Sequence, residues 1–222
     1  MGYDWDFTAL YNGMGLLLQG AGLTLLLAAI AAVFGVALSI GGAATALWGP
    51  ISARRAVLTY VELIRNTPFI VQLFFIFFGL PSLGVRMPAL AAASLAMVIN
   101  LTAYGTEIMR AGMQSVPPGQ REAGVALGIR PLVAFALIIL PQAVATVYPA
   151  LVSQIIITML ESAVVSQIAV TDLTHAADFI QSRSYRAFET YGAVALIYLG
   201  MAVTLRWLFG LIGRRYFTTG PA

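Results

Sequence analysis

No charged residue occurs between Asp6 and Arg54, and the apolar run inside this interval limits how the chain can fold. The run is longer than the roughly 20 residues that a helix needs to cross a bilayer core of about 30 Å. Over the 222 residues, 60% are hydrophobic and 9% are charged, against about 25% charged in soluble domains. The sequence therefore predicts a multi-pass all-α membrane protein with one transmembrane domain over residues 1–222.

Five apolar stretches are long enough to span the membrane, separated by short polar segments. Trp48, Gly49 and Pro50 end the first, since proline cannot continue a helix and tryptophan favours the membrane interface. Prolines are also expected to kink or break later helices, at Pro68, Pro141 and Pro149. The predicted spans cover residues 19–47, 57–80, 88–109, 142–168 and 191–212.

The arginines indicate the orientation of these spans, because cytoplasmic loops carry an excess of positive charge. With five spans, nine arginines fall on one side and three on the other. The N-terminus is then outside and the C-terminus in the cytoplasm, and the polar segment 171–189 is external. The three external arginines are Arg86, Arg183 and Arg186, and the cytoplasmic set is Arg54, Arg55, Arg65, Arg110, Arg121, Arg130, Arg206, Arg214 and Arg215.

The residue inventory excludes several classes of chemistry. All twelve basic residues are arginine, so no P-loop with its lysine is present, and without cysteine there is no thiolate metal site or cysteine nucleophile. His175 is the only histidine and falls in the external segment, where a solvated side chain is expected. The arginines form no patch with interleaved aromatics, so nucleic acid is not an expected partner. We expect no catalytic residue, metal site or cofactor in this chain.

The segment 116–130 interrupts the apolar chain on the predicted cytoplasmic side. Pro117 and Pro118 suit a helix start and Gly128 a helix stop. Its residues are more apolar than those of a solvated loop, while Arg121 and Glu122 keep it out of the bilayer. Such a helix is typical of a surface that meets a protein partner; the alternative is an interfacial helix that lies on the lipid.

From Glu122 to Pro141 the chain reads EAGVALGIRPLVAFALIILP. This stretch resembles the EAA signature of ABC importer permeases, with glycine replacing the second alanine. The resemblance implies a type I permease fold and a cytoplasmic helix that inserts into a separate ATPase subunit, which binds ATP and Mg. The coupling residues that it implies are Arg121, Glu122, Ala123, Gly124 and Gly128.

Three further stretches resemble the polar amino-acid branch of these permeases. They read VELIRNTPFIVQLFFIFFGLP over 61–81, AYGTEIMRAGMQSVPPGQREAG over 103–124 and IIITMLESAVVSQI over 155–168. The resemblance implies a bacterial inner-membrane importer in which the chain pairs with an identical or related permease, two ATPase subunits and an external solute-binding protein. The implied cargo is a polar or cationic amino acid, or a derivative such as an opine.

Polar side chains inside the spans are candidates for a substrate pocket, because burying them in lipid is costly. Gln72 and Asn100 lie near the middle of their spans, and Glu161 falls in the outer half of its span. The alternatives are hydrogen bonds between helices for the amides and exposure to water at the outer interface for Glu161. The candidate substrate residues are Thr67, Gln72, Asn100, Glu161 and Ser162.

Two pairs of opposite charges have helical spacing and are interpreted as structural ion pairs within or between helices. They are Glu62 with Arg65 and Glu107 with Arg110. A membrane hydrolase lacks support, since no G-x-S-x-G elbow occurs and the histidine is external. A secondary transporter or channel, using Glu107 and Glu161 as relays without an ATPase, is the remaining alternative to the permease.

Overall fold

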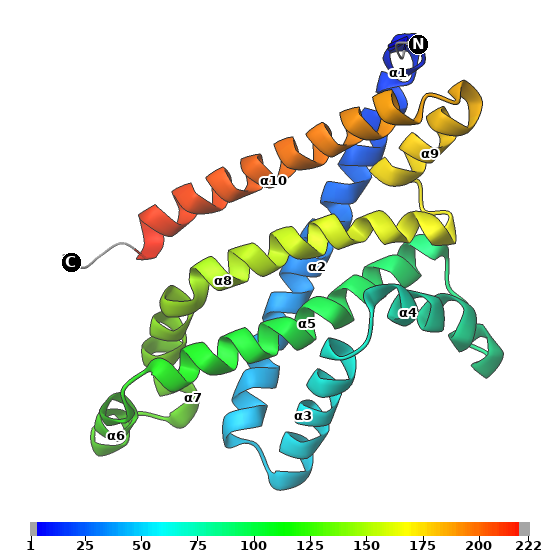
Figure 1. The fold of residues 1–222 in the computed structure, drawn as a ribbon. Helices are drawn as coiled ribbons and strands as arrows, with labels where there is room; N and C mark the ends of the chain where they lie inside the picture. The colour runs from blue at the N-terminus through cyan, green and yellow to red at the C-terminus, as the bar shows by residue number, and fades with distance from the viewer. Residues whose placement is uncertain (1–3, 218–222) are drawn as a thin grey trace.

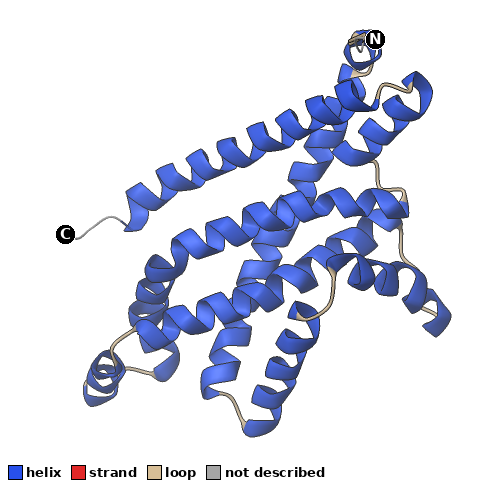
Figure 2. Ribbon diagram, in the orientation of Figure 1, coloured by secondary structure: helices blue, strands red, loops and turns tan. Residues whose placement is uncertain are grey.

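The computed structural model describes residues 4–217, and this part of the chain is helical without strands (Figures 1 and 2). The all-α prediction is confirmed. In chain order the helices are α1 Thr8–Asn12, α2 Met14–Trp48, α3 Ile51–Arg65, α4 Phe69–Phe74, the π-helix η1 Phe75–Gly79, the 3₁₀-helix η2 Leu80–Leu83, α5 Ala89–Ser115, α6 Pro118–Ala126, α7 Pro131–Ala134, the π-helix η3 Phe135–Ile139, α8 Leu140–Glu161, the 3₁₀-helix η4 Ser162–Ile168, α9 Leu173–Ser184 and α10 Ala187–Phe217.

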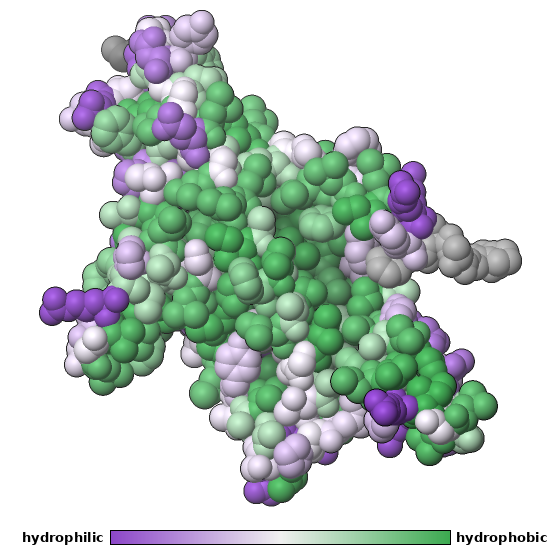
Figure 3. Space-filling view, turned by 180° about the vertical axis from the view of Figure 1, so that it is seen from behind, coloured by the Kyte–Doolittle hydropathy of each residue, from purple (hydrophilic) through white to green (hydrophobic). Residues whose placement is uncertain are grey.

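Four of these helical stretches are long and apolar enough to cross a membrane. They cover Met14–Trp48, Ala89–Ser115, Pro131–Ile168 and Ala187–Tyr216. Each is longer than the stretch predicted from sequence, at 19–47, 88–109, 142–168 and 191–212. The apolar surface covers the middle of the molecule, and the most hydrophilic side chains gather at its projecting ends (Figure 3). This distribution is the one that a helical bundle embedded in lipid requires.

The predicted span over 57–80 is not one straight helix. The structure breaks it at residues 66–68, and the helices Ile51–Arg65 and Phe69–Leu83 are bent by 110° at the break, so a fifth span exists only if this bent pair is counted as one. Pro68 has extended backbone angles, φ −62° and ψ 140°, and it carries no N–H to continue the preceding helix. Proline also disfavours a helical conformation at Thr67, which precedes it.

Small residues bring α2 and α5 close together along most of their length. A methyl group on Gly35 would lie 3.0 Å from Leu101, and one on Gly42 would lie 2.6 Å from the hydroxyl oxygen of Thr106. In α5, a methyl group on Gly105 would in turn come within 2.9 Å of Ser39. Such contacts are the usual basis of helix packing in membranes, where lipid provides no hydrophobic drive between helices. These two helices form the closely packed centre of the fold.

At the end of the molecule that holds the N-terminus, α9 packs onto α2 and α10 (Figure 1). Asp172 caps the start of α9 by accepting a hydrogen bond from the backbone N–H of His175 at 3.0 Å. Its side chain is fully buried and also accepts a hydrogen bond from the Tyr198 hydroxyl at 3.4 Å. The backbone N–H of Leu173 donates to Thr24 of α2 at 3.3 Å. The predicted external segment 171–189 therefore contains a helix held by a buried polar network.

The last helix, α10, is the least buried of the four candidate spans. Large apolar side chains along it are exposed, including Leu196, Val203 and Trp207. Its C-terminal half runs beside the first half of α8, and the two are joined where the Tyr148 hydroxyl donates to the Phe209 carbonyl at 2.7 Å. An apolar face of this kind is suited to lipid or to another membrane helix.

Candidate functional site: the α6 helix and the polar cluster at the span break

The predicted cytoplasmic helix over 116–130 is present as the shorter α6, Pro118–Ala126. Pro118 occupies its first turn, where the missing N–H is not needed. At the other end, the N–H of Gly128 donates to the Val125 carbonyl and the N–H of Ile129 donates to the Gly124 carbonyl, both at 3.0 Å. Gly128 has φ +66°, the left-handed conformation that such a paired-bond stop requires. The boundaries of α6 are therefore encoded locally.

Gly124 is the one residue of α6 that is buried. A methyl group in its place would lie 3.4 Å from the Cβ of Ala134 and 3.9 Å from Ile138 Cδ1, which are ordinary van der Waals distances. This glycine thus seats α6 on α7 and η3, and the alanine of the EAA signature would also fit. Glycine in place of the signature alanine therefore allows the same packing of α6 on its neighbours.

Apart from Gly124, α6 and the residue that follows it carry charge and exposed apolar surface. Arg121, Glu122 and Ala123 are exposed. Val125 is 68% exposed and Leu127 is 76% exposed, and neither lies within one of the candidate spans. Exposed apolar side chains outside the spans are typical of a surface that meets another protein or lies on the lipid.

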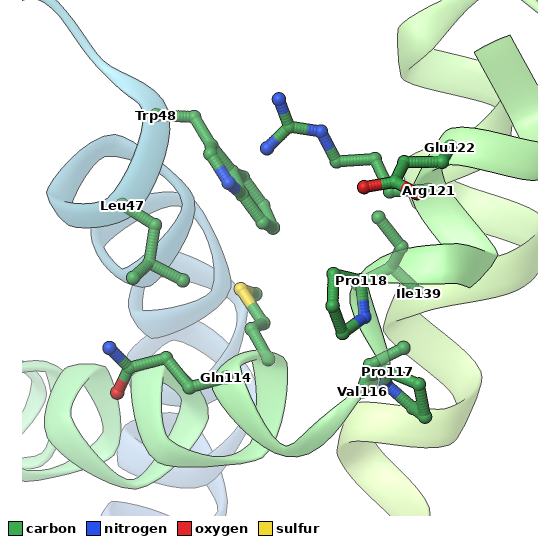
Figure 4. A pocket seen from close by; sticks show the side chains of 10 residues that line it. Leu47, Trp48, Gln114, Val116, Pro117, Pro118, Arg121, Glu122 and Ile139 are labelled. Carbon is green, nitrogen blue, oxygen red and sulfur yellow. The ribbon is translucent and has the colours of Figure 1, made fainter.

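A recess of about 480 Å³ separates α6 from the end of α2 (Figure 4). Trp48, Pro118, Arg121 and Glu122 line it, and the Arg121 side chain extends toward the Trp48 ring. Trp48 also contacts Phe135 of η3 edge to face, with ring centroids 5.8 Å apart. The end of the first span and the support of α6 are therefore in direct contact. From its place in the sequence, Trp48 was predicted only to lie at the membrane interface, and its contact with this site was missed.

Three of the predicted substrate residues lie together at the span break. The Gln72 amide nitrogen donates to the carbonyls of Ile64 at 2.8 Å and Thr67 at 3.0 Å, which the break leaves without helical partners. Asn100 of α5 donates to the Gln72 side-chain oxygen at 3.1 Å. The Asn100 side-chain oxygen is buried and accepts no hydrogen bond from the described residues. The amides thus hold two helices together and leave one buried acceptor unused.

The other two predicted substrate residues lie at the end of α8. Ser162 is fully buried and its hydroxyl donates to the Met159 carbonyl at 2.7 Å. Glu161 is half-buried one residue earlier. Within residues 4–217, no hydrogen bond or ion pair joins either side chain to Gln72 or Asn100.

Of the two predicted ion pairs near the break, one forms as predicted and the other has a different partner. Glu107 accepts two hydrogen bonds from Arg110, at 3.0 and 2.7 Å, as the helical spacing indicates. Arg65 does not turn to Glu62: it lies 3.9 Å from Glu107 of α5 and over the ring of Tyr104. The second ion pair therefore links α3 to α5. Among residues 4–217 no group of three or more potential metal ligands occurs.

A known protein family matches most of this chain. Residues 35–218 match the family described as "Binding-protein-dependent transport system inner membrane component". The chain belongs to this family. Its members are translocation subunits of ABC transporters, and ATP is hydrolysed by a separate subunit. The resemblance to ABC importer permeases, drawn from the EAA-like stretch, is thereby confirmed.

Similar proteins include named amino-acid permeases. The chain is 32% identical over 217 residues to the "Glutamine transport system permease protein GlnP" of Escherichia coli K12, covering 97% of this chain and 98% of that one. It is 38% identical over 146 residues to the "Probable glutamine ABC transporter permease protein GlnM" of Bacillus subtilis, covering 66% and 68%. Both matches extend over most of the two chains.

Solved structures share the fold. A chain from "Crystal structure of an amino acid ABC transporter with histidines" superposes with a TM-score of 0.85 at 39% identity, covering 96% of this chain and 100% of that one. A methionine ABC transporter in an inward-facing conformation gives a TM-score of 0.78 at 19% identity, covering 91% and 97%, which shows a shared fold alone. The type I importer permease fold is confirmed.

Proposed function

We propose that this chain is the permease subunit of an ATP-driven importer that carries an amino acid or an amino-acid derivative across the bacterial inner membrane. The family match and the amino-acid permeases among its relatives support the cargo class. The chain acts with two ATPase subunits, a second permease and an external solute-binding protein. Its N-terminus and α9 are outside, and α6 and the C-terminus are in the cytoplasm.

The observation that carries this proposal is the construction of α6. The helix is fixed at both ends by its own prolines and glycine, and is seated through Gly124, yet it leaves Val125 and Leu127 exposed. A helix that is held by its own chain and still exposes apolar side chains can transmit a push or pull from a partner. In alternating access, closure of the ATPase pair would move α6, and the contact between Trp48 and Phe135 would pass that motion to the first span.

Copurification tests the assembly first. The tagged chain, extracted in mild detergent, should bring with it an ATPase and either a second permease or only further copies of itself. Recovery of the chain alone, still transporting after reconstitution, would contradict the proposal and favour a secondary transporter.

A pair of matched glycine variants tests the role of α6. Gly128 and Gly84 both have positive φ, +66° and +85°, and both have open space where a side chain would lie. Gly128→Val and Gly84→Val should therefore strain the backbone alike, by about 1–2 kcal/mol. Only Gly128→Val should uncouple substrate-stimulated ATPase activity in the reconstituted complex. Equal activity in the two variants would exclude α6 as the coupling element.

For the cargo, we propose that Thr67, Gln72, Asn100, Glu161 and Ser162 contribute to a substrate pocket near the middle of the membrane. The buried, unused Asn100 oxygen supports this, because it can accept a hydrogen bond from a substrate ammonium group. Asn100→Ala and Glu161→Gln should each raise the KM for transport. Loss of stability with an unchanged KM in both variants would assign these side chains to helix packing alone.

A further inference from the structure

A groove of about 430 Å³ runs between α8 and the C-terminal half of α10. Ala145 and Val152 of α8 and Gly210 and Gly213 of α10 give it an apolar lining. It lies within two candidate spans, on the half of the molecule that holds the start of α8 and the C-terminal end of α10 (Figure 1). The proposed function makes no use of this groove.

Glycines and one tyrosine give the groove a fixed shape. A methyl group on Gly213 would lie 2.7 Å from the Tyr148 ring, so the two helices touch there. The Tyr148 hydroxyl donates to the Phe209 carbonyl and holds the same contact. At Gly210, by contrast, an added methyl group would meet no atom within 4 Å. The groove is therefore open at Gly210 and closed where Gly213 meets Tyr148.

The charged side chains that line the groove are both arginines. Arg206 and Arg214 are exposed and lie eight residues apart on α10, which is about 12 Å along the helix. Within residues 4–217, Arg206 forms no hydrogen bond or ion pair with another side chain. An arginine within a span is costly unless it reaches water or meets an anion. No carboxylate lines the groove to provide that anion.

We propose that this groove binds an anionic phospholipid from the leaflet on the side of α6. An acyl chain lies along Ala145, Val152 and Gly210, while the lipid phosphate pairs with Arg206, and Arg214 adds a second positive charge nearby. A soluble anion would gain nothing from the apolar lining, and a zwitterionic lipid would bring its cation toward two arginines. Basic pockets between spans on the cytoplasmic side are known to suit anionic headgroups.

The headgroup is tested by native mass spectrometry of the chain with the subunits that copurify with it. After delipidation, the protein is offered phosphatidylglycerol or phosphatidylcholine, and bound lipid is counted. The wild type should retain phosphatidylglycerol preferentially, and Arg206→Gln should lower that preference about fivefold, the effect of removing one arginine near an anionic headgroup. Arg54→Gln removes an exposed arginine of α3 outside the groove and should leave the preference unchanged.

The groove itself is tested with a second matched pair. Gly210→Leu should fill the open space without a clash and displace the lipid at unchanged charge. Gly200→Leu adds the same side chain on α10, again with no atom within 4 Å of its Cβ, but outside the groove, and should retain the lipid. A photo-crosslinking residue at position 210 should label phospholipid in the intact complex.

Three results would overturn the proposal. Equal loss of preference in Arg206→Gln and Arg54→Gln would indicate general surface attraction. Full phosphatidylglycerol retention in Gly210→Leu would place the lipid elsewhere. Crosslinking from position 210 to a polypeptide, including a second copy of this chain, would show that protein occupies the groove. None of these results bears on the coupling role of α6, which is measured by ATPase activity.

Discussion

The short helices α9 and α6 lie at opposite ends of the bundle and differ in how they are completed. α9 buries Leu173, Ala176, Ala177 and Ile180 against the spans, and its capping Asp172 is fully enclosed. α6 buries Gly124 and leaves its larger apolar side chains exposed. Both helices have well-formed ends, so the difference is not one of local stability. α9 is enclosed by its own chain, whereas α6 leaves apolar surface uncovered, where the proposed ATPase subunit would bind.

The largest expected effect compares one truncation in the two helices. Leu173→Ala removes a fully buried side chain of α9 and should lower stability by about 2–5 kcal/mol through the cavity that it leaves. Leu127→Ala, just after α6, removes a 76% exposed side chain and should change stability by less than about 0.5 kcal/mol. Thermal unfolding in detergent measures both effects.

In a functional assay the two variants should rank in the opposite order, with the larger effect for Leu127→Ala. In the reconstituted complex, Leu127→Ala should lower substrate-stimulated ATPase activity by weakening contact with the partner. If Leu127→Ala instead destabilised the isolated chain as much as Leu173→Ala, the view of α6 as an open surface would be wrong.

A second comparison tests the close contact between Gly20 of α2 and the start of α9. A methyl group on Gly20 would lie 2.7–2.9 Å from backbone atoms of Asp172 and Leu173. Because backbone cannot move aside as a side chain can, Gly20→Ala should cost about 1–3 kcal/mol. Gly22→Ala, two residues along α2, meets no atom within 4 Å and should gain up to about 1 kcal/mol from helix propensity. Similar melting temperatures for the two variants would show that α9 is loosely held.

A smaller effect on stability is expected at Gly124, where α6 packs on α7 and η3. Gly124→Ala restores the alanine of the EAA signature, and its methyl group would sit 3.4 Å from Ala134. The variant should be stabilised by up to about 1 kcal/mol, with ATPase coupling retained. A loss of coupling with unchanged stability would mean that the partner contacts the backbone of α6 at this glycine.

The smallest effect is a pH dependence that belongs to α9 alone. Burial raises the pKa of the Asp172 carboxyl above its ordinary value of 3.8, although hydrogen bonds from His175, Thr174 and Tyr198 oppose the rise. Since the folded pKa exceeds the unfolded one, the stabilisation from proton binding is complete below the unfolded pKa. It is lost as pH rises through the folded pKa.

Asp172→Asn retains an oxygen to cap α9 and removes this titration. The asparagine variant should therefore gain stability relative to the wild type as pH rises from about 4, near the unfolded pKa of aspartate. The remaining titrating groups are shared, so the difference between the two melting curves isolates Asp172. A difference that is constant from acidic to neutral pH would contradict the raised pKa. No such dependence is expected for α6.

Much of this fold could be predicted because apolar length is a strong signal in membranes. The first, third, fourth and fifth spans follow from long apolar runs with few charges, and α6 follows from Pro118 and Gly128, whose backbone preferences act locally. The family resemblance rested on the same local pattern. These features need no knowledge of what the chain folds against.

The features that sequence missed depend on distant partners. The run 57–80 is apolar enough to be taken as one span, and Pro68 indicates a possible break but not its 110° angle. Arg65 has Glu62 at helical spacing, yet the neighbouring α5 offers Glu107 instead. The segment 171–189 was predicted only to be polar and external, and the packing of α2 and α10 is what buries its Asp172. Likewise, the contact of Trp48 with Phe135 joins residues far apart in the chain.

The broken span has a consequence for the order in which the protein is made. As the ribosome delivers α3 and α4, Gln72 can cover the carbonyls at the break, but its own oxygen has no donor until Asn100 follows. Arg65 likewise waits for Glu107. Both missing partners come from α5, so these contacts of the bent pair can form only after α5 has been made. Insertion of this protein therefore includes a step in which an earlier segment is completed by a later one.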